Sequence, residues 1–375
     1  LLDIEKVLCY NGQQVKKNRW KTRRKKIMKK GFALVMASMM ALSLTACGGN
    51  ASSATTAADT SAADTKAEGT TAAAPADKIG LAGSGKELIF TTGGDQGTYY
   101  GFGSVLAGQI SDMTDTTVTA IVGKGSKGNI EAMDAGDAQL GFVQSDVMAY
   151  AYNGTNLFDG AKVDGFSTVA ALYMEQVQIV TLNPDIKTVA DLKGKTVSVG
   201  DSGSGVYFNA LDCLGAYGLT IDDITPTYQS FGDSVEAMQD GKIDAAFIVA
   251  GAPTTAVTSL AATRKVYLVE LDDEHIDKLI EASPYYSKYT IAKDAYGLDA
   301  DATTVAVGAV VVARDDVDEN DIYNAVAGIY DSIDTLGHDK KNELDLDFAA
   351  SVTAVPYHKG AAKYFAEKGL TVPTK

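Results

Sequence analysis

Two short loops rich in glycine and hydroxyl residues are the features of this sequence best suited to chemistry. Residues 91–98 read TTGGDQGT and residues 200–205 read GDSGSG, and each loop follows a strand-like run and precedes a helical pattern. Glycine lets a ligand approach the backbone closely, and free N–H groups at a helix start attract anions. Neither loop fits a Walker loop or a dinucleotide fingerprint. The pair indicates an anion site, with ordinary helix-starting turns as the alternative.

Polar residues also follow other strand-like runs. They occur at 125–129 (GSKGN), 144–146 (QSD) and 250–253 (AGAP). Lys127 is interpreted either as a solvated loop lysine or as an anion contact, and Asp146 either as a helix N-cap or as a ligand contact. The predicted ligand-binding residues are Gly94, Gly97, Thr98, Tyr99, Ser126, Asn129, Gln144, Ser145, Asp146, Tyr173, Ser202, Gly203, Ser204, Gly205 and Gly251.

Several kinds of site are not expected. The three histidines, His275, His338 and His358, lie outside these loops, and no Cys–His, Ser–His or metal-ligand spacing appears. No metal, cofactor or enzymatic activity is therefore predicted. After residue 27 the chain has only two arginines, Arg264 and Arg314, and both are predicted to lie at the surface. An arginine clamp on a carboxylate is thus not expected.

Short strand-like runs that alternate with helical patterns predict an α/β fold with parallel sheets, in which ligands bind at the carboxyl ends of strands. Strands are predicted at 87–92, 118–122, 139–143, 177–182, 196–199, 224–228, 245–249, 266–269 and 304–312. Helices are predicted at 99–112, 128–135, 206–217, 233–240, 255–263 and 320–336.

An internal echo indicates two similar lobes. Residues 132–136 (AMDAG) lead to Phe142, and residues 237–241 (AMQDG) lead to Phe247, at a constant offset of 105. Residues 97–100 are likewise echoed by 205–208. The alternative is coincidence between two generic βαβ units. If the echo is real, each lobe directs a helix N-terminus toward a shared cleft.

The charge distribution separates the first residues from the rest. The whole chain carries −15, but residues 1–46 carry +9 and the remainder −24. An acidic body argues against nucleic-acid binding. Met28-Lys29-Lys30 is followed by an uncharged apolar run, 31–46, and then by Cys47, the pattern of a signal peptide. Residues 44–47 (LTAC) resemble the lipobox of bacterial lipoproteins, and an ordinary signal peptide is the alternative.

These segments lead to a predicted organisation of the chain. Residues 1–27 are expected to be an upstream extension that is not translated, 28–46 a lipoprotein signal peptide, and 47–85 a lipidated Cys47 with a disordered tether. Cys213 then has no internal partner and is predicted to be a small core residue on a helix. We expect the protein on the extracytoplasmic face of the cell membrane, held by lipid, or in the periplasm.

Several short motifs occur along the folded body, from about residue 88 to 375. They are 92–100 (TGGDQGTYY), 125–129, 140–146 (LGFVQSD), 189–195 (VADLKGK), 203–205, 241–245 (GKIDA) and 304–307 (TVAV). In type and order these motifs resemble the TAXI family, the solute receptors of tripartite ATP-independent periplasmic (TRAP) transporters. Lys127-Gly128 departs from the Val-Glu-like pair that is common in relatives.

The resemblance implies a two-lobed type II periplasmic-binding-protein fold with a ligand cleft between the lobes. Lobe 1 would contain 86–178 and 304–375, lobe 2 would contain 179–303, and the crossings at 175–179 and 303–306 would form a hinge. The implied ligand is a small carboxylate or amino acid, glutamate-like or dicarboxylate, and the implied partners are TRAP membrane permease subunits. The alternative is a solute-binding lipoprotein of an ABC importer for a small anionic solute.

Overall fold

A computed structural model describes residues 78–375 of the chain. The predicted upstream extension, signal peptide, lipidated Cys47 and most of the predicted tether lie outside the described residues. The folded body begins earlier than predicted, because residues 78–85 are held on it. Ile79 bridges to Thr114, the Leu81 amide donates to Asn324 Oδ1, and the Ser84 amide donates to Asp321 Oδ1. The predicted start of the body near residue 86 is thus corrected to about residue 78.

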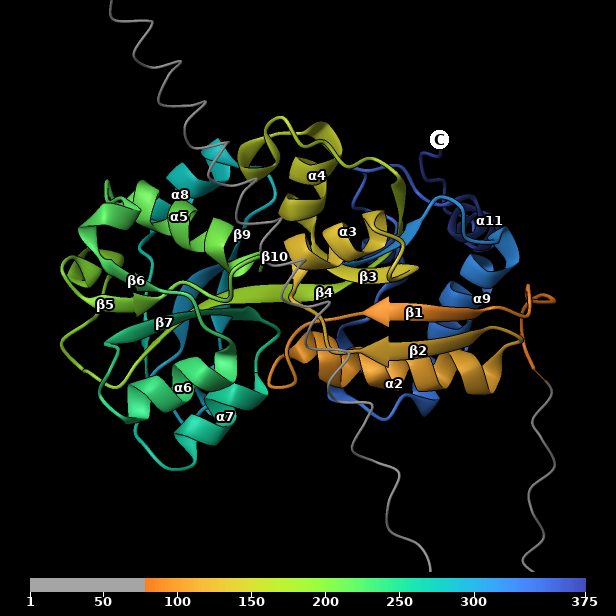
Figure 1. The fold of residues 1–375 in the computed structure, drawn as a ribbon. Coiled ribbons are helices and arrows are strands. Elements are labelled where there is room, and N and C mark those ends of the chain that lie inside the picture. The colour runs from red at the N-terminus through yellow and green to blue at the C-terminus, as the bar shows by residue number, and fades with distance from the viewer. Residues whose placement is uncertain (1–77) are drawn as a thin grey trace, which may run out of the picture. The chain divides into compact units, whose positions relative to one another are not determined.

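The strands form one ten-stranded sheet in the order β2-β1-β3-β10-β4-β7-β5-β6, with β8 on β4 and β9 on β10 (Figure 1). Their bounds are β1 Glu87–Thr91, β2 Thr117–Ile121, β3 Leu140–Gln144, β4 Phe166–Thr181, β5 Thr196–Ser198, β6 Thr225–Thr227, β7 Ala245–Ala250, β8 Tyr267–Val269, β9 Ser287–Ile291 and β10 Ala302–Arg314. The predicted α/β fold with two lobes is confirmed: β1–β3 belong to one half, β5–β7 to the other, and β4 and β10 run through both.

The two long strands change partners along their length. β4 pairs with β10 up to Gln176 and with β7 from Gln176 onward. β10 pairs with β9 up to Ala306 and with β3 from Ala309 to Ala313. Each half is therefore built on part of the same two strands, and the crossing region lies where the partners change.

The sheet is mixed, which corrects the prediction of parallel sheets. β1 pairs in parallel with β2 and β3, and β5 with β6 and β7, but the pairs made by β4 and β10 are antiparallel. The alternation of strands and helices in the sequence identifies parallel strands joined by helices, and it does not identify antiparallel strands that are joined without a helix. The predicted strand 177–182 is only the second part of β4, and β9 was not predicted.

Helices cover both faces of the sheet in each half (Figure 1). Their bounds are α2 Thr98–Met113, α3 Ser126–Asp134, α4 Ser145–Asn153, α5 Val206–Ala216, α6 Phe231–Gln239, α7 Thr255–Ala261, α8 Asp273–Ala282, α9 Glu319–Tyr330, α10 Leu346–Ala349 and α11 Lys359–Glu367. The short helices are η1 Asn156–Phe158, η2 Val189–Leu192, η3 Ile221–Asp223, η4 Lys293–Ala295, η5 Ile333–Thr335 and η6 Asp339–Glu343. The helices α4, α8, α10 and α11 were not predicted.

The internal echo corresponds to equivalent places in the two halves. Gly136 follows α3 and precedes β3, and Gly241 follows α6 and precedes β7, both with positive φ. Gly97 and Gly205 are the N-cap residues of α2 and α5. Glycine adopts the left-handed conformation without the steric cost that a Cβ brings, which explains its use in both turns.

Buried apolar residues form clusters on both faces of the sheet in each half. Cys213 is buried and free on α5, as predicted, and burial raises the pKa of its thiol well above the usual range. Among residues 78–375, no helix combines the length and apolar character needed to cross a membrane.

Candidate functional site

A cavity of about 90 Å³ lies where the carboxyl ends of strands from both halves meet. Loops after β1, β2, β5 and β6, and the ends of β3 and β7, supply its walls, and β4 adds Glu175. The lining residues are Gly93, Gly94, Asp95, Gln96, Gly97, Thr98, Tyr99, Gly123, Lys124, Gly125, Ser126, Gln144, Glu175, Asp201, Ser204, Gly205, Val206, Ser230, Phe231, Gly232, Val249 and Ala250.

Five helices, α2, α3, α4, α5 and α6, begin at this cavity, and three of them begin with glycine. Gly97, Gly125 and Gly205 are the N-cap residues of α2, α3 and α5, and none provides a side-chain cap. Only α6 has a capping side chain, Ser230, which accepts from the Asp233 amide. Uncapped helix starts carry partial positive charge and N–H donors. The cavity is therefore lined by groups that favour an anion.

Two buried polar atoms on the lining have no hydrogen-bond partner among the described residues. They are Gln144 Oε1 and Ser204 Oγ, on residues that are 2% and 8% exposed. Most buried polar atoms in proteins are paired, because an unpaired one costs about 1–3 kcal/mol. Atoms left open on a cavity wall are thus positioned to meet a ligand.

Gly205 fits its position because a side chain would collide with the opposite half. A Cβ there would lie 1.8 Å from Gln144 Oε1 and 2.8 Å from Ser126 Oγ. Its backbone is right-handed helical, with φ −70°, so the requirement is space and not an unusual conformation. The close approach of the halves explains the glycine in this loop.

Hydrogen bonds join the two halves around the cavity. The Gly128 amide donates to the Gly203 carbonyl at 2.8 Å, and Gln144 Nε2 donates to Asn209 Oδ1 at 3.0 Å. Thr98 Oγ1 donates to the Gly251 carbonyl at 2.9 Å. These bonds hold the halves in contact over the enclosed volume.

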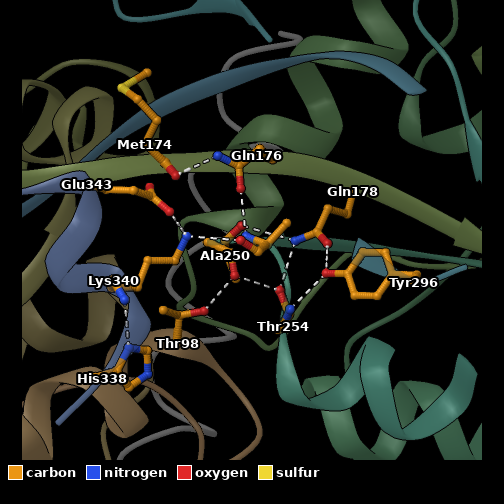
Figure 2. A network of polar contacts seen from close by, with 12 residues as sticks. Thr98, Met174, Gln176, Gln178, Ala250, Thr254, Tyr296, His338, Lys340 and Glu343 are labelled. Atoms are coloured by element: carbon orange, nitrogen blue, oxygen red, sulfur yellow. Dashed lines mark hydrogen bonds and ion pairs between the residues drawn. The ribbon is translucent and has the colours of Figure 1, made fainter. Parts of the chain in front are cut away.

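Figure 2 shows how the loop after β7 is held in the crossing region. Gln176 Oε1 accepts from the Ala252 amide at 2.6 Å, and Gln178 Nε2 donates to Thr254 Oγ1 at 2.9 Å. From the other side, Lys340 Nζ donates to the Ala252 carbonyl at 3.0 Å and pairs with Glu343. Residues of β4 and η6 thus fix the loop that follows β7 and begins at the cavity.

Glu175 is a buried carboxyl group on the cavity wall. It is 2% exposed, and Tyr99 donates its hydroxyl hydrogen to Glu175 Oε2 at 2.7 Å. Burial raises the pKa of Glu175 to about 8, while the hydrogen bond from Tyr99 and the charge of Lys340 oppose that rise. The group is therefore easily switched between its neutral and ionised forms near neutral pH.

A second buried carboxyl group, Asp146, lies between the halves and outside the cavity lining. Its Oδ2 accepts from Asn209 Nδ2 at 3.1 Å, and Asn209 Nδ2 also donates to the Tyr286 hydroxyl at 2.8 Å. Tyr286 in turn donates to Asp212 Oδ2 at 2.9 Å. Burial raises the pKa of Asp146 to about 7, and the charge of Asp212 adds to the rise.

The structure brings together eight of the fifteen predicted site residues. Those on the lining are Gly94, Gly97, Thr98, Tyr99, Ser126, Gln144, Ser204 and Gly205, and those off it are Asn129, Ser145, Asp146, Tyr173, Ser202, Gly203 and Gly251. The N-cap alternative for Asp146 is wrong, because Gln144 is the N-cap residue of α4.

Most residues off the lining serve the framework. Asn129 donates to the carbonyls of Thr92 and Phe142, which joins the ends of β1 and β3. Ser145 Oγ accepts from the Gly308 amide at 3.0 Å. Ser202 is exposed on the outer side of its loop. Their positions after strands made them candidates, but their side chains do not line the cavity.

Several lining residues escaped sequence reasoning. Ser230, Phe231 and Gly232 follow β6, so the rule of strand ends could have found them. Glu175 lies inside a long strand and carries no such pattern. Lys124 lines the cavity, whereas Lys127 lies off the lining in the first turn of α3 and pairs with Glu131, so it is neither a loop residue nor part of the cavity wall.

Fold and cavity together define a two-lobed α/β protein with a partly open cavity between its lobes. The chain belongs to the NMT1-like family, which matches residues 90–369. The comparisons do not support the narrower resemblance to TAXI receptors of TRAP transporters.

Similarity to individual proteins is more limited. The chain is 43% identical over 70 residues to a putative aliphatic sulfonates-binding protein of Escherichia coli K12, a match that covers 19% of this chain and 22% of that protein. It is similar to the alkanesulfonate-binding protein SsuA from Xanthomonas axonopodis pv. citri bound to MOPS, with 16% identity, a TM-score of 0.41 and coverage of 75% and 83%. It is also similar to the periplasmic aliphatic sulphonate binding protein SsuA from Escherichia coli, with 19% identity and a TM-score of 0.40. That match covers 75% of this chain and 78% of the other.

Proposed function

We propose that this protein is an extracytoplasmic solute receptor that binds a small anionic solute in the cavity between its lobes and delivers it to a membrane permease. The observation that carries the proposal is the set of three helices that begin at the cavity with uncapped glycines, beside the unpartnered atoms of Gln144 and Ser204. Such a lining compensates negative charge locally, in a body that is acidic overall. Membership in the NMT1-like family supports the same class of function. No enzymatic activity is proposed.

An ABC importer is the transporter that the comparisons favour. The short match to a putative aliphatic sulfonates-binding protein supports a sulfonate or another small anion as the solute. The second candidate is a TRAP transporter with a small carboxylate or amino acid, which rests on the motifs at 140–146 and 189–195. A neighbouring ATPase gene would support the first, and a TRAP permease gene the second.

The proposed organisation assigns 78–178 and 304–375 to lobe 1, with the start corrected from residue 86, and 179–303 to lobe 2. The hinge is placed where β4 and β10 change partners, at Gln176 and Ala306. Opening there would separate the hydrogen bonds that join Gly128 to Gly203 and Gln144 to Asn209 and would admit the solute.

Binding at the cavity is tested by Gly205→Ala. The added methyl group cannot fit unless Gln144 turns and breaks its bond to Asn209, so we expect at least tenfold weaker binding of the anion. Gly215→Ala is the matched control, because it lies on the same helix with no atom within 4 Å of the new Cβ. The measurement is a thermal-shift screen of small carboxylates and sulfonates on refolded protein, followed by calorimetry. Equal affinities in the two variants would place the solute elsewhere.

Lipid anchoring is a separate proposal that rests on residues 44–47. Cys47→Ala is expected to release the protein from membranes, because the acyl chains attached to Cys47 would be the only anchor proposed. Membrane fractionation of cells that express the whole chain measures this, with Cys213→Ala as control. Continued membrane association of Cys47→Ala would contradict lipidation at that residue.

A further inference from the structure

The cavity lining contains two kinds of polar group with opposite requirements. The helix starts at Gly97, Gly125 and Gly205 favour an anion. The same cavity is lined by Gln144, whose Oε1 is a hydrogen-bond acceptor, and by Glu175, whose carboxyl group carries a negative charge when it is ionised. An anion alone would satisfy the first kind and leave the second without a partner.

The orientation of Gln144 is fixed by a directional chain of hydrogen bonds. Tyr286 uses its only hydroxyl hydrogen on Asp212, so it must accept from Asn209 Nδ2. Asn209 therefore directs its Oδ1 toward Gln144, which must donate through Nε2. The remaining atom of the amide, Oε1, is left without a partner beside the cavity. It can only accept, so it requires a donor from the solute.

Glu175 adds charge to this requirement. Its recorded protein partner is Tyr99, which donates to Oε2, and no salt bridge to Glu175 is found within residues 78–375. The nearby Lys340 is occupied by Glu343 and the Ala252 carbonyl, as Figure 2 shows. An ionised carboxylate that is buried without a cation is costly, so Glu175 keeps its proton in the free protein, and a cationic group on the solute would stabilise the ionised form.

We propose that the solute is a zwitterion, whose anionic group is held at the helix starts and whose ammonium group is held by Glu175 and Gln144 Oε1. This inference rests on the proposed function and narrows its solute class to small amino acids or aminosulfonates. Glu175 becomes the residue that distinguishes an aminated anion from its counterpart without the amine. A carboxylate–ammonium hydrogen bond in a buried site is stronger than a neutral one.

The titratable and charged groups around Glu175 come from several elements. They are Tyr99 on α2, Tyr173 on β4, Asp146 on α4, and Lys340 and Glu343 on η6. With the pKa of Glu175 at about 8, the free protein holds a proton there at pH 7. An ammonium group binds the ionised form, so binding releases that proton. Affinity for the aminated solute then rises as pH increases toward 8 and falls again at the higher pH where the solute's own ammonium group loses its proton.

The test uses the refolded whole chain and a panel of small carboxylates and sulfonates, each paired with its amino counterpart, such as ethanesulfonate with 2-aminoethanesulfonate and glutarate with L-glutamate. We expect calorimetry to give at least tenfold tighter binding for the aminated member of the pair that binds. Titrations at pH 7 in buffers of different ionisation enthalpy are expected to detect release of close to one proton, and much less at pH 8.5, where Glu175 is mostly ionised before the solute binds.

Glu175→Gln keeps an acceptor for Tyr99 and removes the charge. This variant is expected to lower the affinity for the aminated solute at least tenfold and to change the affinity for the counterpart without the amine less than twofold. Glu131→Gln is the exposed control. Equal binding of both members, or binding without proton release, would overturn the zwitterion and leave the anion receptor intact. If no member of the panel binds, the proposed function fails and this inference fails with it. The wild-type measurements decide the matter even if Glu175→Gln does not fold.

Discussion

Glu175 and Asp146 are both fully buried carboxyl groups with raised pKa values, yet their surroundings differ. Glu175 lines the cavity and accepts one hydrogen bond, from Tyr99. Asp146 lies off the lining and accepts from Asn209, which belongs to the other half of the molecule. One oxygen of Asp146 also lacks a partner among the described residues. The open side of Glu175 faces a space for solute, whereas Asp146 lies between two protein surfaces.

The difference separates two tasks that a two-lobed receptor must perform. Groups such as Glu175 define what the cavity accepts, and groups such as Asp146 and Asn209 define how well the halves fit together. Both tasks involve buried polar groups, so burial alone does not identify a ligand contact. The two kinds of buried polar group differ in what they face: a group such as Glu175 faces the cavity, and a group such as Asp146 faces the opposite lobe.

The largest effect is expected from breaking the contact between the halves. Asn209→Ala leaves Gln144 Nε2 and Asp146 Oδ2 without their partner, and it removes the donor to the Tyr286 hydroxyl, which keeps its bond to Asp212. Since each unpaired buried group costs about 1–3 kcal/mol, we expect a loss of about 3 kcal/mol or more in the free energy of unfolding. Urea denaturation measures it, with the exposed Asn153→Ala as control.

Tyr99→Phe provides the other half of this comparison. It removes the only hydroxyl recorded on Glu175, and we expect a loss of about 1 kcal/mol in the free energy of unfolding, together with altered solute affinity. If Tyr99→Phe destabilised the protein as much as Asn209→Ala, the two carboxyl groups would not have separate tasks.

These tasks differ in how far the sequence alone reveals them. The loops at 91–98 and 200–205 were recognisable because glycine and hydroxyl residues follow strands, and the cavity does form there. Glu175 was missed because a polar residue inside a strand has no distinctive spacing. Asn209 was missed because its role depends on the opposite lobe, which no local pattern encodes. The first part of β4 was missed because it returns antiparallel, outside the strand–helix alternation.

Per pH unit, a smaller effect is expected from the titration of these two carboxyl groups. A carboxyl group with a raised pKa binds its proton more tightly in the folded state, so the free energy of unfolding falls as pH rises from its unfolded to its folded pKa. The window runs from about 4 to about 7 for Asp146 and from about 4.5 to about 8 for Glu175. Each group contributes at most about 1.4 kcal/mol per pH unit inside its window.

Urea denaturation between pH 4.5 and 8.5 measures this slope and separates the two groups. Asp146→Asn is expected to remove the part of the slope that ends near pH 7, and Glu175→Gln the part that extends to pH 8. A saturating aminated anion should flatten only the contribution of Glu175, because only that group faces the cavity. Slopes that are the same in both variants as in wild type would show that neither carboxyl group titrates as described.

The smallest expected effect concerns two lysines at the cleft, and it tests whether anion recognition is local. Lys124 is exposed and lines the cavity, whereas Lys127 is three residues away and paired with Glu131. An exposed charge contributes about 0.2–1 kcal/mol, so Lys124→Ala should lower the affinity for the anion about twofold to fivefold, and by less at high salt. Lys127→Ala should leave the affinity unchanged in the same calorimetric titration. If both variants weakened binding equally, the general positive charge of the loop would hold the anion, and the helix starts at Gly97, Gly125 and Gly205 would lose their assigned role.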